Sequence, residues 1–230
     1  MSASFVPDRW VPGDRLTADR HERVPEPAPG AATIGVLALQ GDVLEHLRAL
    51  RRCGAAAVTV RRADQLAEVD GLVLPGGEST TIGKLLERFG LLAPLRTRVA
   101  SGLSVFGTCA GMILLSDELE QAEPQPLVGG LHVRTRRNAF GRQLDSFDTR
   151  IEVAGIDGGP MDVAFIRAPR VEAVLSHDVE VLARVDGFPV VVRQGALLAT
   201  AFHPEVCGDD RLHAAFVATV EGARTGASSG

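Results

Sequence analysis

Residues 104–115, with the sequence SVFGTCAGMILL, carry the most informative local pattern in the chain. The apolar run over Leu103–Phe106 predicts a short buried strand, and the residues from Ala110 to about Leu119 predict a helix. Between them lies Gly-x-Cys-x-Gly, with Cys109 at its centre. A sharp strand-to-helix turn of this kind holds a nucleophilic side chain above the end of a sheet. The segment therefore predicts an α/β fold that presents a reactive cysteine.

The segments around this turn alternate between buried strands and amphipathic helices. Thr33–Leu39 is a continuous apolar run, as in a strand buried on both faces, and Asp42–Cys53 has apolar residues at helical spacing. Such alternation predicts a parallel sheet covered by helices on both faces, and the second half of the chain is richer in strands. We expect one α/β domain with a mostly parallel central sheet, flanked by helices and extended by antiparallel strands. The other predicted strands are at 57–61, 71–74, 130–135, 148–153, 163–166, 179–185, 189–193 and 197–202, and the other helices at 80–89, 94–100 and 209–221.

The two ends of the chain lack this pattern. Residues 1–32 contain five prolines, many charges and no sustained periodicity, so we expect a flexible N-terminal extension. A functional tail is the alternative, and the true translation start is expected near residue 30. We expect the folded domain over residues 33–222 and a flexible C-terminal tail over residues 223–230.

The composition is that of an ordinary globular protein, with 45% of the 230 residues hydrophobic and 23% charged. A net charge of −5 gives no general attraction to nucleic acid or to an anionic membrane, so neither is expected as a partner. The three cysteines lack paired spacing, which favours reduced thiols in the cytoplasm. No apolar run reaches the roughly 18 residues that a transmembrane helix needs. The early Asp8 and Arg9 do not suit a signal peptide.

Cys109 is the candidate nucleophile. The helix after it offers its positive dipole end, which favours the thiolate, and the amide of Ala110 is placed to donate to an oxyanion. The alternative is a small buried residue, as free cysteines often are. Glycines on both sides of the turn favour the functional interpretation. Cys53 and Cys207 have no such setting and are expected to be structural.

His203 is the candidate base, because a cysteine nucleophile needs a base whose tautomer is fixed by a third group. It follows the predicted strand at 197–202, and the loops after strands are where open α/β sheets build their sites. Pro204 favours an extended conformation at His203, which would place Glu205 on the same side of the chain. A surface loop with an incidental histidine is the alternative. The other histidines lie in the N-terminal extension or in ordinary predicted elements.

Two further segments are candidates for ligand contact. The loop LPGGESTT at 74–81 follows a predicted strand, and Gly76 and Gly77 allow its backbone to approach a ligand, although a simple tight turn is the alternative. Ser79 is a candidate helix cap. The basic residues near Arg137 are suited to gripping a carboxylate, whereas a solvated face is the commoner meaning of such a run. The segment FIRAP at 165–169 is ambiguous in the same way. Zinc-type, dinucleotide-type and P-loop spacings are missing, so no metal or cofactor is expected.

These motifs together resemble the class I glutamine amidotransferases, and among them the glutaminase subunits of pyridoxal 5′-phosphate synthases. The elbow cysteine and the His-Pro-Glu segment mark the superfamily, and the remaining segments mark the subgroup. The matching residues are GVLALQG at 35–41 with Glu45-His46, LPGGESTT at 74–81, GTCAG at 107–111, Arg137-Asn138, GRQ at 141–143, DSF at 145–147, FIRAP at 165–169 and FHPE at 202–205.

The resemblance implies a catalytic triad in which Cys109 attacks the side-chain amide of glutamine, His203 moves the proton and Glu205 orients His203. It implies an oxyanion hole from the backbone of Gly76, Gly77 and Ala110. It also implies that ammonia passes to a synthase subunit, a (β/α)8 barrel that combines it with a pentose phosphate and a triose phosphate in a large hetero-oligomer. The positions implied for glutamine binding are Gly77, Glu78, Ser79, Arg137, Ile166 and Arg167.

The sequence departs from the family pattern at two places, and two other functions are still compatible with it. Asp148 stands where the family pattern leads us to expect glutamate, and the residues before Thr33 have no counterpart in the motifs. One alternative keeps the glutaminase but gives it another synthase partner, such as imidazole-glycerol-phosphate synthase. The other is a non-catalytic protein that binds and organises a synthase.

Overall fold

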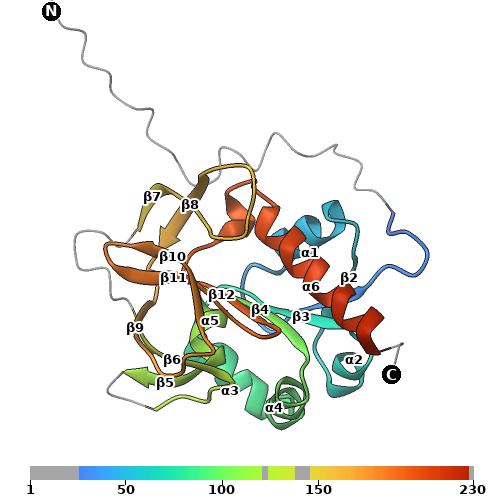
Figure 1. Ribbon diagram of the computed structural model, residues 1–230. Coiled ribbons are helices and arrows are strands. Elements are labelled where there is room, and N and C mark those ends of the chain that lie inside the picture. The colour runs from blue at the N-terminus through green and yellow to red at the C-terminus, as the bar shows by residue number, and fades with distance from the viewer. Residues whose placement is uncertain (1–25, 121–123, 138–145, 228–230) are drawn as a thin grey trace, which may run out of the picture.

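The computed structural model describes residues 26–120, 124–137 and 146–227, and is built around a seven-stranded sheet (Figure 1). The strand order is β10-β11-β12-β4-β3-β1-β2. The five strands from β12 to β2 pair in parallel, whereas β11 and β10 are antiparallel additions at one edge. This confirms the predicted mostly parallel sheet with antiparallel strands. The bounds are β1 (Thr33–Leu37), β2 (Ala56–Val60), β3 (Gly71–Leu74), β4 (Ser104–Thr108), β10 (Glu180–Val185), β11 (Phe188–Gln194) and β12 (Leu197–Thr200).

Helices cover both faces of this sheet. Figure 1 shows α1 and α6 on one side and α3, α4 and α5 on the other, so both faces of the central strands are covered by helices. Every residue of β3 and β4 is buried, including Ser104 and Thr108 at the two ends of β4, as expected for strands that are covered on both faces. The bounds are α1 (Val43–Arg52), α2 (Ala63–Ala67), α3 (Ser79–Arg88), α4 (Leu92–Ala100), α5 (Ala110–Leu115), the 3-10 helix η1 (Pro204–Val206) and α6 (Arg211–Ala227).

Two small sheets extend the second half of the chain. A three-stranded sheet has the order β5-β6-β9, and β7 pairs antiparallel with β8. On the β7–β8 hairpin, the rings of Phe147 and Phe165 stack with their centroids 4.7 Å apart. The hairpin brings the carboxyl end of β8 toward the end of β4. The bounds are β5 (Ser116–Glu120), β6 (Leu131–Arg136), β7 (Ser146–Ile151), β8 (Met161–Ile166) and β9 (Arg170–Val174).

The helix after Cys109 is shorter than predicted. It ends at Leu115, and Ser116 begins β5, which pairs in parallel with β6. The hydroxyl of Ser116 donates to the carbonyl of Ile113 at 2.7 Å and lies 2.9 Å from the hydroxyl of Thr135. Tertiary pairing therefore overrides a sequence pattern that favours a longer helix. The sequence pattern also fails to predict the short helix α2 and the strand β9.

The two predicted chain ends need correction. Ala32 falls within the predicted extension, yet it is fully buried, and its carbonyl accepts a hydrogen bond from the amide of Ala56. Helix α6 is predicted to end near residue 221, but it continues to Ala227. Arg224 explains why, because it donates to the carbonyl of Gly30 and lies 3.4 Å from the carboxylate of Asp70. Residues 1–25 of the expected extension and 228–230 of the expected tail lie outside the described residues.

None of the helices in the described part of the chain is both long and apolar enough to cross a membrane.

Candidate active site

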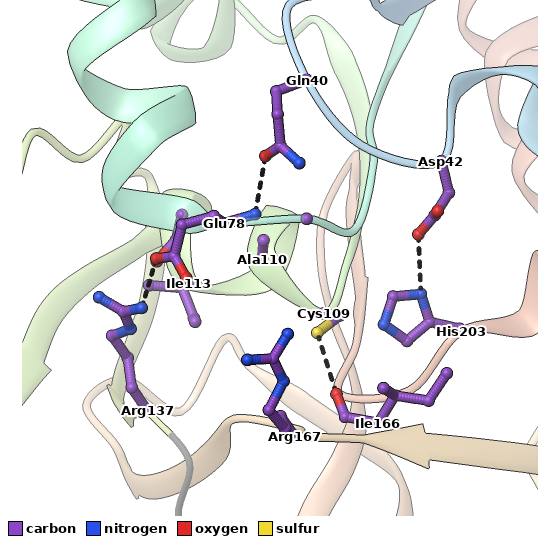
Figure 2. A pocket seen from close by; sticks show the side chains of 12 residues that line it. Gln40, Asp42, Glu78, Cys109, Ala110, Ile113, Arg137, Ile166, Arg167 and His203 are labelled. Atoms are coloured by element: carbon purple, nitrogen blue, oxygen red, sulfur yellow. Dashed lines mark hydrogen bonds and ion pairs between the residues drawn. The ribbon is translucent and has the colours of Figure 1, made fainter. Parts of the chain in front are cut away.

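The carboxyl ends of four parallel strands meet at one edge of the central sheet. Asp42 follows β1, Gly77 follows β3, Cys109 follows β4 and His203 follows β12, and all four line one pocket (Figure 2). Because parallel strands all end on the same side, their loops converge there. The pocket has a volume of about 340 Å³. That volume lies within the range of about 300–1,000 Å³ that is usual for small-molecule sites.

Cys109 sits on the strained turn that the sequence predicts. Its φ of 48° and ψ of −101° are rare for a residue with a side chain, and its amide donates to the carbonyl of Thr200 at 2.8 Å. The flanking glycines are required by space: a Cβ on Gly107 would lie 2.6 Å from the carbonyl carbon of Gly111, and a Cβ on Gly111 would lie 2.0 Å from the carbonyl oxygen of Leu74. Close packing of the two glycines therefore holds Cys109 in a strained conformation at the pocket.

His203 lies in the same pocket with two carboxylates beside it. Its Nδ1 is 2.8 Å from Oε1 of Glu205 and 3.3 Å from Oδ2 of Asp42. The pairing with Glu205 agrees with our expectation, but its geometry differs. His203 precedes the 3-10 helix Pro204–Val206, so a helical turn, and not an extended segment, folds Glu205 back onto the ring. Asp42 is a site residue that the sequence does not predict.

These contacts make the His203–Glu205 pair retain a proton. Burial by itself lowers the pKa of His203, but hydrogen bonds with Asp42, Cys109 and Glu205 outweigh this effect and raise the pKa above its ordinary value. Burial also raises the pKa of Glu205, while its hydrogen bond with His203 opposes that rise. A shared proton stabilises both groups in this largely buried setting. The pair is thus suited to accept and return a proton during catalysis.

The Gly76–Gly77 loop packs directly against His203. A Cβ on Gly76 would lie 2.3 Å from Cε1 of that ring, and a Cβ on Gly77, whose φ is 149°, would lie 2.6 Å from Oε1 of Gln40. The amide of Glu78 donates to the same Gln40 oxygen at 2.8 Å (Figure 2). The loop is therefore more than a simple tight turn, since close packing requires both glycines. Gly77 and Ala110 line the pocket, whereas Gly76 is not among the lining residues and packs against the His203 ring.

Arg137 and Glu78 face each other across the other side of the pocket, where Figure 2 shows them joined by an ion pair. Arg137 also donates to the hydroxyl of Thr80 at 2.6 Å. The neighbouring Arg134 pairs with Glu118 outside the pocket, so the solvated-face interpretation applies to it. Asn138 and residues 141–143 of the expected motif lie outside the described residues.

Ser79 lines the pocket as the first residue of α3, and not as its cap. The cap is Glu78, whose carboxylate accepts a hydrogen bond from the amide of Thr80 at 3.4 Å. The hydroxyl of Ser79 donates to the side chain of Gln125 at 3.2 Å. The expectation that Ser79 caps the helix is therefore wrong, although its place beside the ligand pocket matches the predicted set.

Ile166 and Arg167 come from the end of β8. The carbonyl of Ile166 lies 4.0 Å from Sγ of Cys109, and Arg167 has a φ of 44°. Figure 2 shows the guanidinium of Arg167 pointing into the pocket between Arg137 and Cys109. Within the described residues, Cys109, Arg167 and Asp186 are those other than glycine with a positive φ. Two of the three line this pocket, where backbone strain commonly marks function.

The structure brings most of the predicted site residues together. Glu205 contacts the pocket through His203, and Gly76 lies beneath that ring. Sequence reasoning missed three lining residues, Gln40, Asp42 and Ile113. The loop after the first strand could have revealed Gln40 and Asp42, because it lies at the same sheet edge as Cys109. The predicted residues that line the pocket are Gly77, Glu78, Ser79, Cys109, Ala110, Arg137, Ile166, Arg167 and His203.

The part of the chain that the structure describes contains one group of side chains with the composition of a metal site. Asp42, His203 and Glu205 each place a ligand atom within 4.8 Å of the others. The imidazole nitrogen in this group already pairs with both carboxylates. Hydrogen bonding accounts for the arrangement, and we assign no metal to it.

Comparison with known sequences gives matches over most of the folded part. The model of the SNO glutamine amidotransferase family matches residues 36–222. A relative from Frankia casuarinae, the pyridoxal 5′-phosphate synthase subunit PdxT, is 62% identical over 194 residues, which is 84% of this chain and 97% of the relative. A relative of the same name from Mycolicibacterium vanbaalenii is 59% identical over 195 residues, which is 83% of this chain and 98% of the relative.

Comparison with solved structures agrees with the sequence matches. A glutamine amidotransferase crystal structure aligns with a TM-score of 0.77 at 48% identity, covering 82% of this chain and 98% of the other. A glutamine amidotransferase from Thermotoga maritima aligns with a TM-score of 0.52 at 13% identity, covering 84% of this chain and 85% of the other. The second likeness shows the shared fold alone.

Proposed function

Because the chain belongs to the SNO glutamine amidotransferase family, we propose that it hydrolyses L-glutamine to L-glutamate and ammonia as the glutaminase subunit of a pyridoxal 5′-phosphate synthase. The observation that carries the catalytic part is the strained Cys109 in one pocket with His203, which Glu205 supports from behind. Nucleophile, base and orienting carboxylate are the three parts that acyl transfer through a thiol needs.

The proposed reaction has two steps. The sulfur of Cys109 attacks the side-chain amide carbon of glutamine while His203 takes the thiol proton. His203 then gives that proton to the departing nitrogen, so the carbon–nitrogen bond breaks, ammonia leaves and a thioester remains. Water attacks the thioester, with His203 as base, and releases glutamate and the free thiol. Glu205 keeps the imidazole in the orientation and tautomer that both steps need.

The negative charge that develops on the amide oxygen needs hydrogen-bond donors. Gly77 and Ala110 line the pocket, and we assign the oxyanion hole to their backbone amides together with that of Gly76. The amide of Glu78 already donates to Gln40, so it is not counted among these donors. The short turn at Cys109 and the glycine loop therefore provide donors from two separate elements.

The opposite side of the pocket suits the charged end of an amino acid. The Glu78 carboxylate complements an α-ammonium group, and the guanidinium of Arg137 or Arg167 complements an α-carboxylate. In this structure Glu78 and Arg137 pair with each other, so each side chain already has a partner of opposite charge. The residues we assign to glutamine binding are Gly77, Glu78, Ser79, Arg137, Ile166 and Arg167.

The relatives' names support a partner for this chain. We propose that ammonia passes to a synthase subunit with a (β/α)8 barrel fold, which combines it with a pentose phosphate and a triose phosphate to make pyridoxal 5′-phosphate. We further propose a large hetero-oligomer in the cytoplasm, in which glutaminase activity depends on the partner. Such coupling would prevent the loss of ammonia to solvent.

Ammonia release from glutamine, measured with and without the synthase partner, tests this proposal. We expect hydrolysis to rise strongly when the synthase is added, and we expect Cys109→Ala to abolish it without preventing complex formation. Cys53→Ala is the matched control, since its thiol is half-buried and lies against the backbone carbonyl of Asp210, outside the pocket. Full hydrolysis by Cys109→Ala would contradict the triad. A complex without any hydrolysis in the wild type would favour the non-catalytic alternative.

A further inference from the structure

A buried polar cluster lies directly behind the proposed triad. It consists of His46 on α1, Thr108 on β4 and His213 on α6, all of them fully buried. Nδ1 of His46 lies 2.9 Å from Nε2 of His213, and Nε2 of His46 lies 3.1 Å from the hydroxyl oxygen of Thr108. Three elements distant in sequence therefore meet at one imidazole ring.

The same imidazole faces the rear of Glu205. Oε1 of Glu205 is occupied by His203, whereas Oε2 is buried and has no hydrogen-bond partner within the described residues. Nε2 of His46 is 3.5 Å from that oxygen. An unpartnered buried carboxylate oxygen costs free energy unless a donor faces it. The nitrogen of His46 is placed to be that donor.

The contacts around the two histidines decide which nitrogens carry protons. Burial, followed by the charges of His213 and His203, lowers the pKa of His46 well below its ordinary value, and burial lowers the pKa of His213 to about 4. Both rings are therefore neutral, and a single proton lies between them. If His46 donated it, Nδ1 of His213 would be a buried N–H without a partner in the described part of the chain, and a bare lone pair of His46 would face Glu205.

The opposite arrangement avoids both costs. With Nε2–H of His213 donating to Nδ1 of His46, the remaining His46 proton sits on Nε2 and points toward Thr108 and Glu205. His213 then keeps only an unpartnered lone pair, which is a smaller penalty than an orphaned N–H. His213 thus holds His46 as a donor toward the carboxylate.

We propose that His46 is a positioning residue of the active site, which keeps Glu205 ionised through its Nε2–H and is itself fixed by His213. This inference rests on the proposed triad. Through Thr108, the residue before Cys109, the same ring also contacts the nucleophile turn. His46 therefore links the two halves of the site: the end of β4 that carries Cys109, and the η1 turn that carries Glu205.

The groups that surround Glu205 determine what losing His46 would do. His203 and Asp42 face it from the pocket side, and His46 faces it from behind. Without the His46 donor, the buried carboxylate would protonate more readily. A neutral carboxyl group donates its own proton to Nδ1 of His203, so the other ring nitrogen keeps its proton and cannot accept one from the thiol. Activity would then fail first at the acidic end of the pH range.

The test compares His46→Leu, which removes the donor, with His46→Gln, whose amide can restore a donor near Nε2. Two pH profiles are measured in the complex with the synthase: glutamine hydrolysis, and alkylation of Cys109 by iodoacetamide followed by peptide mass spectrometry. For His46→Leu we expect the acidic limb of both profiles to move upward by about one pH unit, a tenfold loss at a fixed acidic pH, since a buried hydrogen bond to a charged group is worth roughly tenfold or more. His46→Gln should restore most of the wild-type profile.

Ser104→Ala is the matched control, because Ser104 is a buried hydroxyl on the same strand as Thr108 and has no hydrogen-bond partner among the described residues. It should leave both profiles in place. A His46→Leu profile that is lower at every pH but not shifted would show a purely structural role and overturn the proposal. If the wild-type thiol itself resists alkylation at all pH values, the triad fails instead, so the two failures are distinguishable.

Imidazole ¹⁵N chemical shifts of the wild-type protein provide a second measurement that needs no variant. We expect His46 and His213 to be neutral at pH 7, both with the proton on Nε2. A His46 ring that carries its proton on Nδ1 would present a lone pair to Glu205 and would overturn the proposal, whether or not His46→Leu folds.

Discussion

The two sides of the pocket are built in different ways. The proposed catalytic residues Cys109, His203 and Glu205, which we call the catalytic wall, are buried, and the Glu205 side chain has no exposed surface. The proposed substrate-binding residues Glu78, Ser79, Arg137, Ile166 and Arg167, which we call the substrate wall, include more open positions: the side chains of Glu78 and Arg137 are 48% and 27% exposed. One wall is held by packing at strand ends, and the other is closed by a solvent-accessible ion pair.

This difference indicates that the buried residues serve the chemical step and that the accessible residues serve substrate binding. Buried groups at fixed positions can lower the barrier for chemistry, because their partners need not reorganise during the reaction. An accessible ion pair can open and exchange its partners for a ligand at little cost, because surface pairs contribute little stability. We therefore expect changes in the catalytic wall to lower kcat and changes in the substrate wall to raise KM.

Glu205→Gln should give the largest effect. The amide oxygen is directed toward the N–H of His46, so the amide nitrogen faces Nδ1 of His203 and imposes the wrong tautomer. We expect kcat to fall by about 10³- to 10⁴-fold, as a buried triad carboxylate exchanged for its amide has cost elsewhere. Steady-state kinetics of glutamine hydrolysis in the complex would measure it.

Glu172→Gln provides the control for this change, since Glu172 is a partly buried carboxylate that pairs with Arg170 and Arg136 away from the pocket. It should leave kcat within about twofold, as substitutions remote from a site commonly do. A Glu205→Gln enzyme with normal kcat and a raised KM would erase the proposed distinction between the walls.

Acidification should lower the free energy of unfolding, because of the buried His213 behind the catalytic wall. An unfolded histidine titrates near pH 6.5, whereas burial lowers the pKa of His213 to about 4. The folded protein then binds fewer protons in this interval, so the contribution of His213 to stability is complete above pH 6.5 and is lost as the pH falls toward 4. The gap corresponds to about 3 kcal/mol of unfolding free energy.

Urea unfolding of the wild type and His213→Gln at several pH values isolates this contribution from those of other groups. The variant should be less stable than the wild type at pH 7, because it loses the hydrogen bond to His46. Its disadvantage should shrink, or reverse, as the pH approaches 4. Two stability curves that stay parallel over this interval would mean that His213 is not a buried neutral base.

The contrast between the walls also explains which features of the site can be predicted from the sequence. The catalytic wall was predictable because its signals are local: glycines around Cys109, a strand before it, and Pro204 after His203. The 3-10 turn that folds Glu205 back was missed, although the pairing itself was expected. The position of Asp42 after the first strand indicates a place at the same sheet edge, but its contact with His203 depends on strand order, which is not encoded in any short segment.

The buried histidines show a second limit. The sequence pattern places His46 and His213 in ordinary helices, and they are 167 positions apart in sequence. One signal was present, since His46 lies on the apolar face of α1 beside Leu47 and Leu50. A histidine on such a face predicts burial, but its partner could come only from the docking of α6 against α1. The end of α6 was likewise hidden, because Arg224 is fixed by distant groups.

Arg137→Ala tests the substrate wall with a smaller expected effect. Losing a charged hydrogen bond to the substrate carboxylate should raise KM by roughly tenfold to a hundredfold while kcat stays within about threefold. Arg134→Ala is the control, because Arg134 lies on the adjoining strand β6 and pairs with Glu118 in the solvent. Equal loss in both variants would assign the effect to strand β6, and a fall in kcat alone would place Arg137 with the catalytic wall.

The smallest predicted effect concerns the hydrogen bond that holds the glycine loop, from the amide of Glu78 to Oε1 of Gln40 at 2.8 Å. Gln40→Ala frees the peptide that connects Gly77 of the proposed oxyanion hole to Glu78 of the substrate wall. Both kcat and KM should therefore worsen by about threefold to tenfold, the usual worth of one neutral hydrogen bond. Gln65→Ala is closely matched, since Oε1 of Gln65 on helix α2 accepts a hydrogen bond from the amide of Arg61 at the same 2.8 Å, away from the pocket. Steady-state kinetics of both variants should show a change in Gln40→Ala alone. If Gln40→Ala alters KM without kcat, the glycine loop belongs to the substrate wall only, and the oxyanion donors must be sought at Ala110 and beyond.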